Sequence, residues 1–251
     1  MRIQTAKHRA IEVLRQGASG PPVVLVHGWM TSGSVFAPVM DNLARAARIF
    51  TPDLRGAGRS DPADSYRLDD YARDLISLLE QVGPATIVGH SMGGAIAQLV
   101  AAEQPTSVDK LILLNSVPAR GMQLPEEAMA LFAASAGNRD KQAAILSIAC
   151  LQLKDAARDQ LLDIAATVDD AAIQQSLEAW TTGGFEDRLG AIQAPTHVIA
   201  TSDPFLSPAL LQEAIVDRID QAQLHVLEGP GHYPMWEDPE QTSALLQALI
   251  S

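Results

Sequence analysis

The sequence predicts an α/β protein built on a mostly parallel sheet that helices cover on both faces. Strand-like apolar runs alternate with amphipathic helical segments over most of the chain, which is the pattern of parallel sheets. The alternation stops between residues 118 and 190, where only helical stretches rich in Ala, Leu and Met occur. We therefore expect a core domain of residues 1–117 and 191–251 that is interrupted by a helical insertion, residues 118–190.

The predicted strands are short, continuous apolar runs, as is typical of strands that are buried on both faces. Residues 1–16 precede them, and their polar flanks predict a hairpin. The later strands are expected at residues 23–26, 48–53, 86–88, 111–114, 196–200 and 223–228. Ligand groups in open α/β sheets lie beyond the carboxyl ends of such strands, so the residues that follow these runs are the first candidates for a site.

The predicted helices have apolar residues three and four positions apart. The leucines and the tyrosine between residues 68 and 79 give the clearest example, and Gly83-Pro84 ends this helix. The helices are expected at residues 33–46, 68–82, 92–103 and 208–219, and from residue 238. The glycine-rich stretch Arg55–Arg59 is predicted to be a loop.

Composition and charge exclude several classes of protein. Of the 251 residues, 47% are apolar and 19% are charged, and the net charge is −12. A charge this negative repels phosphate backbones and anionic lipids, so we expect neither nucleic acid nor membrane as a partner. No run approaches the roughly 18 apolar residues of a transmembrane helix. Secreted-scaffold, fibrous, disordered and integral-membrane proteins are therefore excluded.

The single cysteine, Cys150, bears on the compartment. It cannot form an internal disulfide, which suits a reducing environment. The first twenty residues include four basic residues but no apolar stretch of the kind that a signal peptide has. We therefore expect a cytoplasmic protein. Cys150 itself lies in a stretch that predicts an apolar helix, Ile145–Leu153, and is expected to be a packed core residue rather than a nucleophile.

The motif with the clearest chemical meaning is Gly89-His90-Ser91-Met92-Gly93, between a predicted strand and a predicted helix. This is G-x-S-x-G in the strand–turn–helix setting that exposes a nucleophilic serine. Such a turn strains the serine backbone and presses strand against helix, so glycine is needed two residues away on either side. A chance match in a glycine-rich loop is the alternative. We predict that Ser91 is the nucleophile.

A serine hydroxyl needs a base to accept its proton at neutral pH. His232 follows the last predicted strand and is the candidate base; alone, it would be read as a surface-loop histidine. Asp203 follows the strand 196–200 and is the candidate acid, although an aspartate before proline also forms turns. The three candidates occur in the chain order Ser91, Asp203, His232, and this is the order of the triad in α/β hydrolases, which the chain resembles through this motif.

Other positions for the acid are weaker. The residues after the strand 111–114 are Asn115-Ser116, which carry no carboxylate, and Asp217 and Asp220 fall on or after a helix. The oxyanion would need two backbone N–H donors. Met92 is one candidate because helix N-termini have unpaired N–H groups. Trp29, in the loop after the strand 23–26, is the other, with simple packing of Trp29 as the alternative.

Signals for cofactors are weak. Gly56-Ala57-Gly58 begins like a dinucleotide-binding fingerprint, but Asp61 stands where the third glycine belongs, and no P-loop pattern occurs. The six histidines and the single cysteine show no metal-ligand spacing, and His197 and His225 are expected to be strand residues. We expect neither a cofactor nor a metal.

Nearly the whole chain resembles the α/β-hydrolase superfamily. The resemblance rests on His27-Gly28-Trp29, the segment Asp53–Asp61, the Ser91 motif and Gly231-His232. It implies the α/β-hydrolase fold, an eight-stranded sheet with a helical cap inserted after the sixth strand, where residues 118–190 lie. The chain is most similar to small cofactor-free serine esterases, such as pimeloyl methyl ester esterases and enol-lactone hydrolases.

These observations predict a carboxylesterase that cleaves a small, mostly apolar ester through an acyl-enzyme. The cap residues Met122, Phe132 and Trp180 are expected to line the substrate pocket or to pack within the cap. A lactonase, a C–C bond hydrolase or a perhydrolase would use the same Ser-His-Asp triad. A hydrolase-fold receptor or binding protein would keep the fold without turnover.

Charge in the insertion bears on how the substrate is presented. Residues 118–190 contain six basic and eleven acidic residues. An acidic carrier protein would be repelled by this balance, although a local basic patch could form within it. We therefore expect a free small-molecule ester or lactone rather than a carrier-bound substrate.

Overall fold

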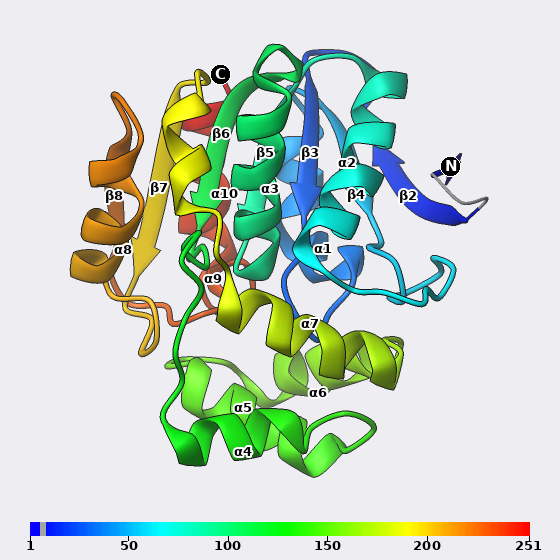
Figure 1. The fold of residues 1–251 in the computed structure, drawn as a ribbon, viewed down its shortest axis with the longest axis vertical. Coiled ribbons are helices and arrows are strands. Elements are labelled where there is room, and N and C mark those ends of the chain that lie inside the picture. Colours follow the sequence, from blue (N-terminus) through cyan, green and yellow to red (C-terminus); the bar gives the residue numbers. More distant parts are fainter. Residues whose placement is uncertain (6–8) are drawn as a thin grey trace.

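The computed structural model describes residues 1–5 and 9–251, and its eight strands form one sheet (Figure 1). The sheet order is β1-β2-β4-β3-β5-β6-β7-β8. The strands are Arg2–Gln4 (β1), Ala10–Gln16 (β2), Pro22–Val26 (β3), Arg48–Pro52 (β4), Ala85–His90 (β5), Val108–Leu114 (β6), Thr196–Thr201 (β7) and Gln223–Leu227 (β8). β1 and β2 pair antiparallel, as do β2 and β4, and every other pairing is parallel. The predicted mostly parallel α/β sheet is confirmed.

Helices cover both faces of the sheet, because alternate residues of each buried strand point to opposite faces. Val24 of β3 and Ile87 of β5 belong to one apolar layer, whereas Val23 and Val88 belong to the other. The helices of the core are Ala37–Leu43 (α1), Leu68–Val82 (α2), Met92–Glu103 (α3), Pro208–Ala214 (α8), Pro234–Glu237 (α9) and Pro239–Ile250 (α10). Side chains of α2, α3 and α8 join the first layer, and those of α1 and α10 join the second.

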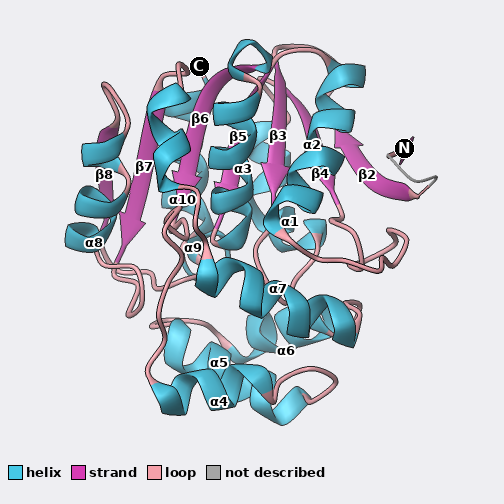
Figure 2. Cartoon of the chain, viewed as in Figure 1, coloured by secondary structure: helices cyan, strands magenta, loops and turns pink. Residues whose placement is uncertain are grey.

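A group of four helices separates β6 from β7 in the chain. They are Glu126–Ala133 (α4), Arg139–Ala149 (α5), Asp155–Ala165 (α6) and Asp170–Thr182 (α7). Figure 2 shows them together beyond the end of the sheet at which the strand arrows point. They therefore lie over the carboxyl ends of the parallel strands, within the segment 118–190. None of the helices that the structure describes is long and apolar enough to cross a bilayer.

Several predicted bounds need correction. The helix expected at 33–46 is a 3₁₀ turn, Gly33–Phe36, followed by α1, because Pro38 starts a new helix in its first turn and ends the preceding pattern. The helix expected at 208–219 ends at Ala214, and Val216–Arg218 form a separate 3₁₀ turn. The hairpin of residues 1–16 is present as the β1–β2 pair, but its connection includes residues 6–8, which lie outside the described residues.

The prediction that Cys150 lies inside a helix is wrong. Helix α5 ends at Ala149, and Cys150 has an extended backbone and a half-buried side chain. The helix stops here because its next peptide groups bond elsewhere: the Leu151 and Gln152 N–H groups donate to the Glu237 carboxylate. Burial, together with that carboxylate, raises the pKa of the Cys150 thiol, which keeps the sulfur protonated and weakly nucleophilic.

Candidate active site

Ser91 stands on a strained turn between β5 and α3. Its backbone has φ 55° and ψ −122°, a conformation that L-residues rarely adopt. The flanking glycines allow the close approach that this turn needs: a Cβ added to Gly89 would lie 2.6 Å from the Gly93 carbonyl oxygen. A Cβ added to Gly93 would lie 2.3 Å from that of Val26. The turn therefore has the geometry that the G-x-S-x-G motif predicted.

The structure brings Ser91, Asp203 and His232 together from the ends of three strands. His232 Nε2 lies 3.1 Å from Ser91 Oγ, and His232 Nδ1 lies 2.5 Å from Asp203 Oδ2. With the proton on Nδ1, the ring donates to the carboxylate and leaves Nε2 free to accept from the serine hydroxyl. The Asp203 side chain is fully buried and that of His232 is 14% exposed, so the relay is largely shielded from water.

Asp203 is held in its ionised form. Burial opposes ionisation, but the His232 ring and the N–H groups of Phe205 and Leu206 outweigh it and lower the pKa of Asp203. These N–H groups donate to Oδ1 at 2.8 and 3.3 Å, which leaves Oδ2 for the imidazole. The rival Asp217 lies in a 3₁₀ turn, where its carboxylate accepts from Gln212 instead.

The loop after β3 runs directly against Ser91. A Cβ added to Gly28 would lie 2.9 Å from Ser91 Cβ, so only glycine permits this contact. Trp29 follows Gly28, and Met92 is the first residue of α3. In the described part of the chain, no protein acceptor meets either backbone N–H. Met92 directly follows Ser91 and Trp29 directly follows Gly28, and their role as oxyanion donors stays a prediction.

Two residues that sequence reasoning missed, His90 and Asn115, form hydrogen bonds to the backbone of the loop that carries His232. His90, the second residue of the serine motif, is fully buried, and its Nε2 lies 2.8 Å from the His232 carbonyl oxygen. Asn115, directly after β6, donates through Nδ2 to Thr201 Oγ1 at 2.9 Å and to the Gly231 carbonyl at 3.2 Å. Asn115 also adopts a positive φ of 42°, which asparagine tolerates better than most residues. Its position at a strand end was the available signal.

An apolar cavity of about 40 Å³ opens beside Ser91 and His232. The predicted residues Met122, Phe132 and Trp180 all line it. The Trp29 and Phe132 rings stack with centroids 5.3 Å apart, and the Trp29 indole N–H donates to a backbone carbonyl of α7. The cavity is therefore narrow and aromatic, and residues of both the sheet domain and helices α4, α5 and α7 form its wall.

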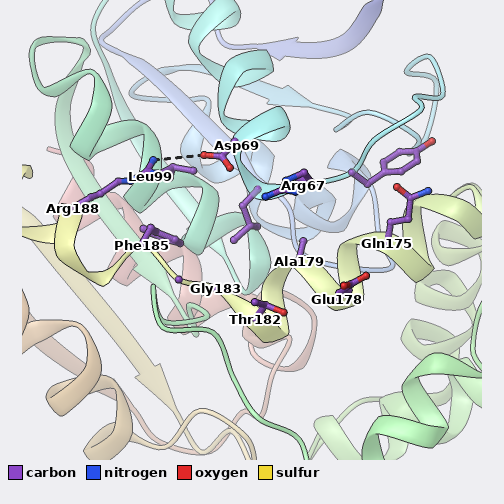
Figure 3. Close-up of a pocket in the computed structure, with 13 residues that line it drawn as sticks. Arg67, Asp69, Leu99, Gln175, Glu178, Ala179, Thr182, Gly183, Phe185 and Arg188 are labelled. Carbon is purple, nitrogen blue, oxygen red and sulfur yellow. Dashed lines mark ion pairs between the residues drawn. The ribbon is translucent and has the colours of Figure 1, made fainter.

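A larger cavity, of about 380 Å³, lies elsewhere, between α2, α3 and the end of α7 (Figure 3). Charged and polar side chains line much of it, and Arg188 forms an ion pair with Asp69 at 3.6 Å. None of Ser91, Asp203 and His232 borders it. The chemistry of the serine therefore belongs to the smaller cavity.

Metal-ligating side chains do not cluster in the described part of the chain. Within residues 1–5 and 9–251, no three His, Cys, Asp or Glu side chains gather in a way that could hold a metal ion. His197 and His225 are strand residues, as predicted, and their rings approach to 3.1 Å between Nδ1 and Nε2.

Known proteins share this sequence pattern and fold. Residues 23–245 match the alpha/beta hydrolase family. The pimeloyl-[acyl-carrier protein] methyl ester esterase of Xanthomonas campestris is 27% identical over 92% of this chain and 96% of its own. An esterase from Exiguobacterium antarcticum superimposes with a TM-score of 0.93 at 22% identity, covering 100% of this chain and 98% of that one. The enol-lactonase from Burkholderia xenovorans LB400 superimposes with a TM-score of 0.87 at 20% identity and 99% coverage of both chains. The family match spans most of the chain, and the protein therefore belongs to the alpha/beta hydrolase family.

Proposed function

We propose that this protein is a serine carboxylesterase that hydrolyses small, mostly apolar esters. The observation that carries the proposal is the hydrogen-bonded series Ser91–His232–Asp203 at the mouth of an apolar cavity. Esterases among its relatives support the same class of reaction. The proposed chemistry needs no cofactor, because a neutral imidazole and backbone N–H groups supply all the proton transfer and charge stabilisation.

In the proposed reaction, Ser91 Oγ attacks the ester carbonyl carbon while His232 Nε2 takes the hydroxyl proton. The Asp203 carboxylate stabilises the imidazolium that forms and fixes its orientation. The Trp29 and Met92 N–H groups donate to the oxyanion; one such donor typically contributes about 10²–10³ in rate. As the intermediate collapses, the leaving alkoxide takes the proton from Nε2, and the acyl group stays on Ser91.

Hydrolysis of the acyl-enzyme repeats these steps with water. His232 Nε2 takes a proton from the water as its oxygen attacks the acyl carbon, and the same N–H pair receives the second oxyanion. Ser91 then leaves with the proton from Nε2, which restores the enzyme and releases the acid. A lactone would follow the same path, with its alkoxide tethered to the acyl part.

We propose further that residues 118–190 act as a cap that selects the substrate. Met122, Phe132 and Trp180 of this segment line the cavity, whose small volume favours short acyl groups. Acidic residues outnumber basic residues in the segment 118–190, which disfavours binding of an acidic carrier protein, so the proposed substrate is a free molecule. Rates for one acyl group as a methyl ester and on an acidic carrier, at low and high salt, test this. A preference for the carrier that weakens with salt would refute it.

The triad is tested by comparing Ser91→Ala with Ser147→Ala, a control that removes an exposed hydroxyl of α5. Ser91→Ala should lower kcat for nitrophenyl acetate by about 10⁴–10⁶, and Ser147→Ala should not. A fluorophosphonate should label the wild type at Ser91. The hydrolysis rates of nitrophenyl esters should fall as the acyl group lengthens from acetate to octanoate. More than a few per cent of residual activity in purified Ser91→Ala would refute the assignment.

A further inference from the structure

Glu237 links two segments that are far apart in the sequence. Its Oε2 atom accepts from the N–H groups of Leu151 at 2.7 Å and Gln152 at 2.9 Å, just beyond the end of α5. The same oxygen accepts from Gly231 N–H at 3.0 Å, and Oε1 accepts from Tyr233 N–H at 3.2 Å. One carboxylate therefore holds residues on both sides of His232 and, at the same time, a segment next to the cavity.

A direct hydrogen bond runs alongside this link. The His232 N–H donates to the Ala149 carbonyl oxygen at 2.9 Å. Ala149 and Ile145 of α5 line the cavity beside Ser91. A substrate that fills the cavity therefore presses on the same stretch of backbone that positions the base.

The charge of Glu237 makes this link strong. Its side chain is half-buried, and none of the ion pairs formed by the described residues includes it. Four backbone N–H groups and the Cys150 thiol meet the carboxylate. Hydrogen bonds to an ionised acceptor are about twice as strong as neutral ones. A neutral side chain at this position would form weaker hydrogen bonds to residues 151–152 and to residues 231–233.

We propose that Glu237 is a positioning residue that fixes His232 relative to Ser91 and couples it to the segment Ala149–Gln152, whose first residue lines the cavity. This inference rests on the proposed function, because it assigns Glu237 an effect that passes through the general base. A purely structural residue would instead affect the folded protein as a whole. A positioning role and a purely structural role predict different effects of a Glu237 substitution on kcat once His232 has been removed.

The test is a double-mutant cycle of Glu237→Gln and His232→Ala, with rates measured on nitrophenyl acetate. Glu237→Gln should lower kcat at least about tenfold in the wild-type background, since a displacement of about 1 Å of a catalytic group can cost 10²-fold. In the His232→Ala background the same change should cost less than about twofold, because groups that act as a unit are not additive. Equal losses in both backgrounds would overturn the proposal.

Two further variants separate the possible failures. Asp238→Ala removes the neighbouring carboxylate, which caps α10 through Gln241 N–H, and should lower the melting temperature while leaving kcat unchanged. If Glu237→Gln does not fold, Glu237→Asp, which keeps the charge on a shorter side chain, carries the same cycle. Wild-type kcat in folded Glu237→Gln with inactive Ser91→Ala would refute only the Glu237 inference. Active Ser91→Ala would refute the triad itself.

Discussion

Replacing Asn115 by alanine should lower the free energy of unfolding by about 2–5 kcal/mol. The side chain is fully buried, and its Oδ1 accepts from the Thr201 N–H at 3.1 Å. Losing this acceptor leaves a buried donor unsatisfied, which costs about 1–3 kcal/mol. Alanine must also adopt the φ of 42°, which adds about 1–2 kcal/mol. In Asn115→Ala the Gly231 carbonyl still accepts from Thr201 Oγ1 and the His232 carbonyl still accepts from the His90 ring, so these two carbonyls add little to the loss of stability.

Urea unfolding followed by circular dichroism measures this loss through linear extrapolation. Asn115→Gly removes the same acceptor without the strain of a positive φ, so it should be less destabilising than Asn115→Ala. Asn42→Ala, which removes a half-buried amide from α1, is the matched control and should cost at most about 1 kcal/mol. An Asn115→Ala loss no larger than that of the control would show that the Thr201 donor finds another partner.

Three other changes have definite outcomes. Asp74→Ala should cost about 3–5 kcal/mol in the same urea assay, because it leaves Arg55 buried without the carboxylate that meets it at 2.7 Å; an unchanged midpoint would contradict this. Gly93→Ala should abolish ester hydrolysis, because the added Cβ would lie 2.3 Å from the Val26 carbonyl oxygen; a wild-type rate would show that the turn can shift. Burial lowers the pKa of His90 from 6.5 to about 3, so between these values the unfolded chain binds more protons than the folded one. Stability should therefore fall with falling pH in that window, by up to about 1.4 kcal/mol per pH unit, and His90→Gln should have the smaller slope in urea midpoints; equal slopes would refute this.

The parts of the fold that local sequence determines were predictable. Helix α2 ends at Val82 because Gly83 adopts a positive φ, and the spacing of its apolar residues gave both ends of this helix. Helix α3 likewise begins at Met92, directly after the strained serine. Buried parallel strands occur as short apolar runs in the sequence, so their positions along the chain were predictable. The eight-stranded count followed from the family resemblance.

The error at Cys150 arises because a distant segment decides the local structure. The end of α5 depends on Glu237, more than eighty residues later in the chain, and no pattern within 145–153 marks it. For the site, strand ends indicated where Ser91, Asp203 and His232 would lie. The strand-end position of Asn115 was a signal, but its contacts with the His232 loop, and that of His90, were not predictable. Both depend on backbone carbonyls of a loop whose path only the folded chain defines.

Ser91, Asp203 and His232 depend on four neighbouring strands, since β5, β6, β7 and β8 lie side by side in the sheet. Ser91 follows β5 and Asp203 follows β7, with β6 between them, while His232 follows the edge strand β8. Parallel strands of this kind join only through long connections, and such non-local pairing forms slowly during folding. Recovery of the proposed ester hydrolysis after dilution from denaturant should therefore lag behind the return of helical signal.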